Sequence, residues 1–269
     1  MNPPFNILAS HHLPQNFTSD VPVVIKHALN NQPAFLNWSP ESLRSDIGRK
    51  KVLVDKSTDG LFRVNPKGGA FIDEMLEMSF TDFLEKISNP TEEALRLYLI
   101  HSSIPINFPE LMPQMTIPHY VDQKRLRHIN LWVGQKGNIS PLHFDTNNNI
   151  LCEVFGRKKI ILYPPQQGKL LYPYSCFTKA PYVSPIRADQ PDFKTYPKFA
   201  SAKPYEVILH PTDIMYIPPF WWHQVFNLDM TISVNFWWRL YKKQCINPSF
   251  ARIVTYRFYN RMKDFIKRV

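Results

Sequence analysis

The sequence predicts a mainly β fold, in which short antiparallel strands form a jelly-roll barrel and helices flank it toward both ends of the chain. Between residues 128 and 240, short runs rich in β-branched and aromatic residues alternate with turns. Glycine is scarce, with 8 residues, and proline is abundant, with 25, which favours strands joined by proline-fixed connections. The segments around His143 and His223 are far apart in the chain, and both carry residues that could bind one metal ion. A double-wound barrel would bring these two segments side by side.

Three strands are predicted in the first 130 residues. Residues 21–25 and 51–55 are short β-rich runs, and residues 96–100 form an apolar run bounded by polar residues. Residues 102–120 carry four prolines, so this segment is predicted to be a loop with a short helix.

Two helices are predicted in the same region. Ser39 stands directly before Pro40, and this pair is typical of an N-cap followed by the first helical residue. The second helix is predicted to start at Ser79. Its apolar residues follow helical spacing: Phe80, Phe83, Leu84 and Ile87.

The strand pattern is strongest between residues 128 and 240. The predicted strands there are 129–133, 157–163, 205–209, 213–217 and 231–238. In the last of these, Thr231, Ser233 and Asn235 form a polar face. That face indicates either a solvated pocket inside the barrel or a strand face in water. Residues 166–204 show little periodicity and are interpreted as a long insertion over one end of the core.

The C-terminal segment 246–269 is predicted to be helical and separate from a domain that spans residues 1–245. Its apolar stripe consists of Ile253, Phe258, Met262, Phe265 and Ile266. Basic residues surround this stripe. The stripe fits either a homodimer interface or a helix packed on its own domain, and the basic face is either simply solvated or an RNA contact.

The bulk composition excludes several classes of protein. The formal charge is +10, which implies attraction to anionic partners such as an acidic protein surface or RNA. No apolar run approaches the roughly 20 residues of a membrane helix, and the first residues lack a signal-peptide pattern. Three widely spaced cysteines indicate a reducing, intracellular compartment, so a cytoplasmic location is expected. No P-loop or dinucleotide-binding glycine motif is present.

The strongest chemical signal is a candidate metal site. His143 and Asp145 are separated by one residue, so in an extended strand both side chains point to the same face. His223 follows an apolar Pro-Pro-Phe-Trp-Trp run and supplies a third ligand. Two imidazoles and one carboxylate with open positions are typical of non-haem Fe(II) oxygenases. Zinc binds similar ligands, and an isolated His-x-Asp triplet also occurs as surface polar residues or as a satisfied His–Asp pair.

A set of motifs in this order resembles the JmjC (cupin-like) 2-oxoglutarate oxygenases, whose core is a double-stranded β-helix. The motifs are His143-Phe-Asp145, Gly156-Arg-Lys-Lys159, Leu162-Tyr-Pro-Pro165, Leu171-Tyr-Pro173, Asp213-Ile-Met-Tyr-Ile-Pro218, Trp221-Trp-His223 and Val234-Asn-Phe-Trp237. The chain is most similar to the small hydroxylase branch, which includes the hypoxia-inducible factor asparaginyl hydroxylase. It is also similar in layout to the wybutosine tRNA hydroxylase.

The resemblance implies a role for each matching residue. His143, Asp145 and His223 match the Fe(II) ligands. Lys158 matches the lysine that pairs with the distal carboxylate of 2-oxoglutarate, whereas neighbouring Lys159 is expected at the surface. The remaining matches to the cosubstrate pocket are Ser140, Tyr98, Asn149 and Asn235, with Trp237 as pocket wall. Core packing for Tyr98 and a turn position for Asn149 are the alternatives.

The implied function is hydroxylation by Fe(II) and the cosubstrate 2-oxoglutarate, with release of succinate and carbon dioxide. A protein or peptide side chain is the expected substrate. A modified tRNA nucleoside or a small molecule is the alternative. The resemblance also implies a homodimer formed through the C-terminal helix, and no membrane partner is expected.

Overall fold

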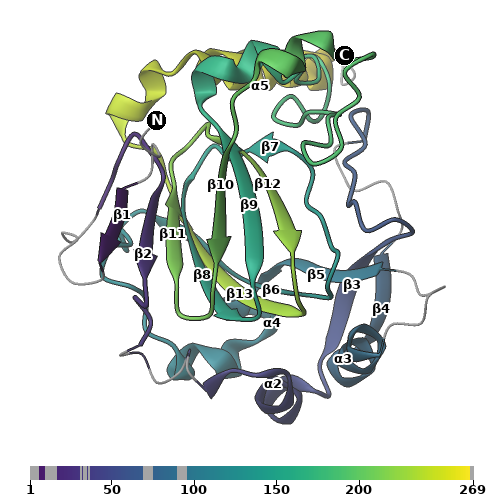
Figure 1. Ribbon diagram of the computed structural model, residues 1–269, viewed down its shortest axis with the longest axis vertical. Helices are drawn as coiled ribbons and strands as arrows, with labels where there is room; N and C mark the ends of the chain where they lie inside the picture. The colour runs from purple at the N-terminus through teal and green to yellow at the C-terminus, as the bar shows by residue number, and fades with distance from the viewer. Residues whose placement is uncertain are drawn as a thin grey trace.

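The computed structural model describes residues 6–9, 17–30, 32, 35, 37–68, 75–89 and 96–266. It confirms the mainly β jelly-roll prediction, with two sheets facing each other (Figure 1). The larger sheet consists, in spatial order, of β1 (Asn6–Ala9), β2 (Val23–Lys26), β11 (Ile214–Ile217), β8 (Asn148–Phe155), β13 (Thr231–Trp238), β6 (Leu126–Gly134), β5 (Arg96–Ser103), β3 (Lys51–Ser57) and β4 (Met75–Ser79). The smaller sheet consists of β10 (Tyr205–Leu209), β9 (Lys158–Tyr163), β12 (Trp222–Asn227) and β7 (His143–Phe144).

The chain alternates between the two sheets along its second half. β8, β11 and β13 lie in the larger sheet, while β9 and β12, which follow β8 and β11, lie in the smaller one. Neighbouring strands are antiparallel except for β1 and β2, which are parallel. This alternation places β7 and β12 next to each other although about 80 residues separate them along the chain.

Helices flank the sheets as expected. The helical elements are α2 (Pro40–Ile47), α3 (Phe80–Ser88), α4 (Ile104–Asn107) and α5 (Pro248–Ile266), with short 3-10 turns η1 (Pro109–Gln114), η2 (Pro165–Leu170), η3 (Pro197–Ser201) and η4 (Lys242–Ile246). The Ser39 hydroxyl caps α2 by accepting the Ser42 backbone N–H at 3.2 Å. The Ser79 hydroxyl accepts the Asp82 N–H at 3.0 Å and caps α3. Both predicted caps are therefore confirmed.

The residues of β9 divide between two buried clusters, one on each face of the strand. Ile160 and Leu162 lie in a buried cluster with Leu151 of β8 and Met215 of β11, between the two sheets. The side chains of Ile161 and Tyr163 face the opposite way. There they pack with residues of the 166–204 segment: Leu171, Ile186 and Phe199. The insertion thus covers the outer face of the smaller sheet and leaves the barrel interior to the other face.

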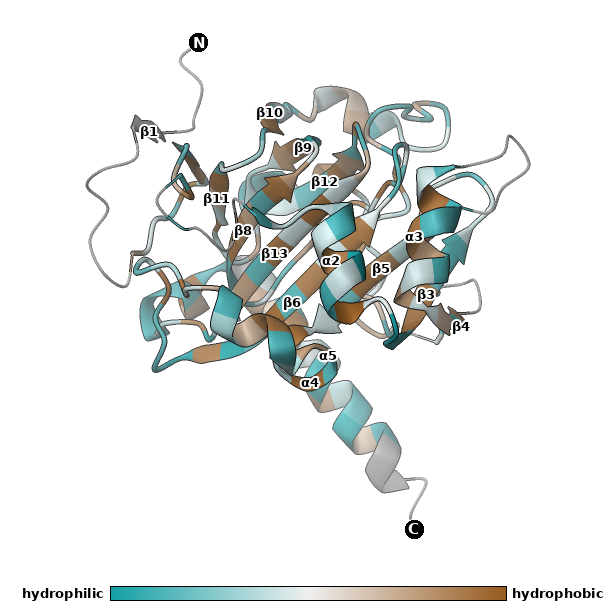
Figure 2. Ribbon diagram, turned by 90° about the horizontal axis from the view of Figure 1, so that it is seen from below, coloured by the Kyte–Doolittle hydropathy of each residue, from teal (hydrophilic) through white to brown (hydrophobic). Residues whose placement is uncertain are grey.

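The C-terminal helix α5 runs away from the body of the molecule toward its end (Figure 2). Ile253 is buried, whereas Phe258 is 66% exposed and Met262 is 45% exposed. The side chains of Phe265 and Ile266 lie outside the described residues. The separate C-terminal segment and the homodimer therefore stay predictions. Among the described residues, no helix combines the length and apolarity needed to cross a bilayer.

The buried Asp213 carboxylate stabilises the turn before β11. Asp213 is fully buried and accepts an ion-paired hydrogen bond from Lys26 Nζ at 2.6 Å. It also accepts the backbone N–H groups of His27 at 3.1 Å and His210 at 2.9 Å. The carboxylate therefore joins β2 to the strand that follows it in the sheet.

We expect Asp213→Ala to lower the free energy of unfolding by about 2–4 kcal/mol, because three donors lose their acceptor in a buried setting. Chemical denaturation followed by circular dichroism measures this change. Glu77→Ala is the control, since Glu77 pairs with Lys51 on an exposed edge and should change stability little. Equal effects of the two substitutions would contradict the assignment.

Candidate metal centre

The three predicted ligands meet at one edge of the smaller sheet. His143 belongs to the short strand β7 and is the direct register partner of His223 in β12. Their ring centroids are 4.3 Å apart. Asp145 follows β7, and its backbone carbonyl accepts the Phe220 N–H at 2.8 Å, which ties the segment to the loop before β12. Strand pairing thus assembles ligands that are distant in the sequence.

The ligand atoms are placed to share an ion. The Nε2 atoms of His143 and His223 each lie 4.0 Å from a different oxygen of Asp145. All three ligand atoms lie within 4.8 Å of one another. Separations of 4.0 Å are too long for hydrogen bonds. Two atoms that are each bonded to one metal ion at about 2.0–2.2 Å lie roughly 3.0–3.6 Å apart, so a bound ion would draw these side chains together by about half an ångström. Within the described part of the chain, no other group of three His, Cys, Asp or Glu side chains has this arrangement.

Backbone carbonyls orient both imidazoles. His143 Nδ1 lies 2.8 Å from the Pro141 carbonyl oxygen, and His223 Nδ1 lies 3.0 Å from the Trp221 carbonyl oxygen. A carbonyl only accepts, so each Nδ1 carries the hydrogen and donates it. Each Nε2 then keeps its lone pair and faces Asp145, which is the tautomer that binds a metal.

Burial disfavours charge on these groups when no ion is bound. Burial lowers the pKa of His223 to about 3, and the neighbouring His143 acts in the same direction. Burial also raises the pKa of Asp145, while His143 and His101 oppose that shift. A neutral imidazole is the form that ligates a cation, and a divalent ion would offset the unfavourable burial of the carboxylate.

An inner cavity extends from the ligands into the barrel. Every residue that the sequence associated with the site lines it: His143, Asp145, His223, Lys158, Ser140, Tyr98, Asn149, Asn235 and Trp237. Eight strands contribute to the full lining of this cavity. The polar face of β13 therefore points into the barrel, and the alternative of a strand face in water is wrong, since Thr231, Ser233 and Asn235 are all buried.

Lys158 projects into this cavity from the start of β9 and is 2% exposed. The corner before it depends on Gly156, which has a φ of 74°, and a Cβ there would meet the Met230 carbonyl oxygen at 2.0 Å. The Lys158 ammonium donates to the Ser233 hydroxyl, and Ser233 donates to Glu153 Oε2 at 2.9 Å. Lys158 Nζ is 3.9 Å from the same oxygen.

Glu153 is a close neighbour of Lys158 that was not predicted from the sequence. It is fully buried on β8, and its Oε1 atom has no hydrogen-bond partner among the described residues. Burial raises the pKa of its carboxyl to about 8, and this shift is opposed by Lys158 and by the hydrogen bond from Ser233. At neutral pH the carboxyl is thus largely protonated, which leaves the Lys158 ammonium available to an anion.

Tyr98 lies beside Lys158 and is 1% exposed. Its ring packs edge-on against Phe62, and its hydroxyl interacts with the Lys158 ammonium and the Asn227 amide. Burial raises the pKa of this phenol, so it stays a hydrogen-bond donor. Core packing and a place at the cavity are therefore both features of Tyr98.

A chain of amides supports the metal ligand Asp145. Asn149 Nδ2 donates to Asp145 Oδ2 at 3.5 Å, and Asn235 Nδ2 donates to Asn149 Oδ1 at 3.3 Å. Asn235 Oδ1 in turn accepts from Asn130 Nδ2 at 3.2 Å and from Trp132 Nε1 at 2.9 Å. Asn149 lies within β8, so the turn alternative is wrong. This series of hydrogen bonds fixes the orientation of the Asp145 carboxylate.

An outer cavity of about 360 Å³ opens on the other side of the ligands. His143, Asp145 and Ser140 line both cavities, and so does His101, a residue that sequence reasoning missed. His101 has a φ of 51° within a bulge of β5, and its ring lies 4.3 Å from the Trp132 ring and 5.1 Å from the Trp237 ring. A left-handed non-glycine residue beside a site is typical of a functional constraint.

Comparison with known proteins identifies the family and several relatives of this chain. The cupin-like domain family matches residues 12–244. Lysine-specific demethylase 8 of Danio rerio is 32% identical over 81% of this chain and 53% of its own length. The human bifunctional peptidase and (3S)-lysyl hydroxylase JMJD7 is 26% identical over 81% of this chain and 77% of its own length. The tRNA wybutosine-synthesizing protein 5 of Gallus gallus is 26% identical over 85% of this chain and 73% of its own length.

The chain spans about half the length of the curated relatives it matches first. The family match covers every strand of the two sheets except β1, and it includes all three candidate ligands. The chain therefore belongs to the cupin-like domain family, and its predicted relationship to the JmjC oxygenases is confirmed.

Proposed function

We propose that this chain is an Fe(II)- and 2-oxoglutarate-dependent hydroxylase that acts on a protein side chain. One observation carries the proposal: a two-histidine, one-carboxylate cluster stands at the entrance of an inner cavity that contains a buried lysine. The cluster suits a divalent metal, and the lysine suits an anionic cosubstrate in the same cavity.

The residues fit ferrous iron by the chemistry of their donors. His143, His223 and Asp145 present two neutral imidazole nitrogens and one carboxylate, and no fourth ligand of these types closes the site within the described residues. Zinc also accepts such donors. The cavity lined by Lys158 favours iron, because it provides a place for a dicarboxylate beside the metal.

The protein's own groups would bind and orient the cosubstrate. Lys158 would pair with the distal carboxylate of 2-oxoglutarate, while the Tyr98 and Ser140 hydroxyls would donate to it. Asn149 and Asn235 would keep Asp145 in place, and Trp237 would form the wall. With dioxygen, bound iron and 2-oxoglutarate supply the oxidising chemistry of C–H hydroxylation, with succinate and carbon dioxide as by-products. The buried cavity keeps water away from this chemistry.

A protein side chain is the first candidate substrate. Similarity to a relative named as a lysyl hydroxylase, over 77% of that relative, supports it. A modified tRNA nucleoside is the second candidate, and similarity to a wybutosine-synthesizing protein supports that one. Hydroxylation of a methyl group, as the name of the demethylase relative suggests, would use the same ligands.

The proposal is tested by succinate formation from 2-oxoglutarate with added Fe(II), with peptide libraries and tRNA as substrates. Wild-type protein should form succinate, and His143→Ala should not. Mass spectrometry of the substrate distinguishes gain of one oxygen atom from loss of a methyl group. Equal succinate formation by the wild type and His143→Ala would contradict the proposal.

Glu153 gives the proposed reaction a specific pH dependence. Below pH 8 its carboxyl is mainly neutral. As pH rises through about 8 it becomes a carboxylate that competes for Lys158. The charged neighbours that act on it are Lys158, Asp213 and Asp229. We expect the KM for 2-oxoglutarate to rise by up to about tenfold between pH 7 and 9.

Glu153→Gln keeps the shape of the side chain and removes its titration. In this variant the KM for 2-oxoglutarate should be nearly constant over the same pH range. Steady-state kinetics at fixed iron measure both proteins. The same pH profile in the variant and the wild type would exclude Glu153 as its cause.

A further inference from the structure

A basic groove leads from the surface to the proposed active site. Two adjoining cavities, of about 1000 Å³ and about 520 Å³, form it. Arg127 and Arg239 line both of them. The second cavity shares Thr146 and Asn147 with the outer cavity that contains the metal ligands. The three hollows therefore adjoin one another, and Asp145 lines the last of them.

The groove is strongly cationic. Five basic side chains line it, Lys124, Arg125, Arg127, Arg239 and Arg257, together with a single carboxylate, that of Asp122. Asp122 is already engaged, because it lies 3.6 Å from Arg125 and accepts the Tyr241 hydroxyl at 2.7 Å. Arg125 is held in place by this pair and by the Tyr241 ring.

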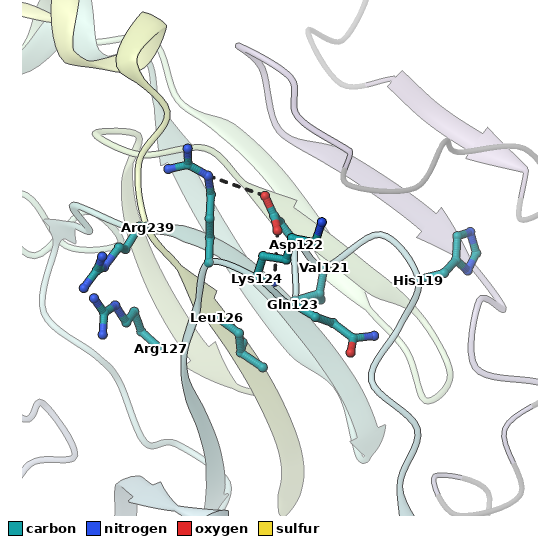
Figure 3. A pocket seen from close by; sticks show the side chains of 9 residues that line it. His119, Val121, Asp122, Gln123, Lys124, Leu126, Arg127 and Arg239 are labelled. Atoms are coloured by element: carbon teal, nitrogen blue, oxygen red, sulfur yellow. Dashed lines mark hydrogen bonds and ion pairs between the residues drawn. The ribbon is translucent and has the colours of Figure 1, made fainter.

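The other four cations face solvent without an acidic partner among the described residues. Arg127 and Arg239 come from the adjoining ends of β6 and β13, and their guanidinium groups lie close together (Figure 3). Two like charges repel unless an anion lies between them. Such a pair in an open groove points to a ligand that carries negative charges in a row.

The uncharged residues of the groove distinguish between anionic polymers. Apolar side chains lie among its cations: Val121, Leu126, Leu240, Phe250 and Ile253. The ring of Phe250 packs edge-on against Phe220, and the His128 ring packs edge-on against Trp237. Proteins that bind single-stranded nucleic acid combine a basic groove with aromatic faces on which bases stack. Cations interspersed with apolar side chains fit a peptide whose acidic and apolar side chains alternate.

We propose that this groove binds an acidic segment of the protein substrate, next to the residue that enters the outer cavity. The proposal rests on the proposed hydroxylase function and narrows its substrate class to proteins with acidic residues on one side of the modified position. Long-range attraction by the groove would also speed the encounter with such a segment.

Binding of a fluorescein-labelled alternating Glu-Leu decapeptide, measured by anisotropy at about 100 mM salt, tests this inference. An oligouridylate of equal length and a Lys-Leu decapeptide are the comparison probes. The groove variant is Arg127→Glu with Arg239→Glu, and Arg127→Gln with Arg239→Gln checks the milder change. The control variant, Arg49→Glu with Lys86→Glu, changes the net charge equally at exposed positions that do not line the groove, one after α2 and one in α3.

We expect the acidic peptide to bind the wild type, and the Glu variant to weaken binding at least about tenfold. The Gln variant should show a smaller loss, and the control variant less than about twofold. Equal losses in groove and control variants, or no binding to the wild type, would overturn the proposal. Tighter binding of the oligouridylate that is lost in the groove variants would assign the groove to nucleic acid instead. The assay needs neither iron nor 2-oxoglutarate, so its outcome is independent of whether the chain is a hydroxylase.

Discussion

Lys158→Ala is expected to raise the KM for 2-oxoglutarate by about 10- to 100-fold, with little change in metal affinity. The reason is that a hydrogen bond between charged groups contributes about 1.5–3 kcal/mol, and each 1.36 kcal/mol is a factor of ten. Lys158 is buried in the inner cavity and has no carboxylate closer than the Glu153 oxygen at 3.9 Å. Steady-state succinate formation and separate metal titration measure the two quantities.

Lys159→Ala is a matched control. Lys159 is the next residue on β9, so its side chain points to the other face, where it pairs with Glu206 at 2.8 Å. Its removal should change the KM less than twofold. Making the Lys158 change in a Glu153→Gln background avoids leaving a buried carboxyl group without its cation. Similar KM values for the two lysine variants would remove Lys158 from the cosubstrate site.

Asp145→Ala is expected to reduce turnover to the rate measured without added iron. The carboxylate is the ligand that both histidines face, so its loss removes the negative charge that a divalent ion needs. The metal-free variant should be at least as stable as the wild type, because burial disfavours the Asp145 carboxylate when no ion is present. Thermal unfolding therefore separates loss of metal from loss of fold.

Asp192→Ala is the control for this variant, since Asp192 is an exposed aspartate that only caps the local turn at Lys194 and Thr195. It should keep wild-type turnover. Substantial iron-dependent activity in Asp145→Ala, at wild-type protein stability, would contradict the assignment of Asp145 as a ligand.

Residues whose roles depend on strand alternation were predictable from the sequence. The His143–Asp145 spacing, the inward direction of Lys158 and the polar face of β13 all follow from a period of two. The same rule places Glu153 on the same face of β8 as Asn149, so the sequence pattern also predicts that Glu153 points inward. The pattern does not predict that Glu153 lies beside Lys158, because β8 and β9 belong to different sheets.

Other features depend on geometry that the sequence pattern does not encode. His101 reaches the site through a bulge in β5 and a left-handed backbone conformation. The basic groove combines residues 119–127, Arg239 and Arg257, which meet only once β6, β13 and α5 are in place. Net charge predicted attraction to an anion, and the fold shows where the cations gather.

The metal site is tested most directly by anaerobic titration of the purified protein with Fe(II), with Mn(II) as a redox-stable probe. We expect one ion per chain in the wild type and none in Asp145→Ala or His223→Ala, with the Lys158→Ala stoichiometry unchanged. Wild-type stoichiometry in the two ligand variants would show that the ion binds elsewhere and would contradict the assignment of His143, Asp145 and His223 as its ligands.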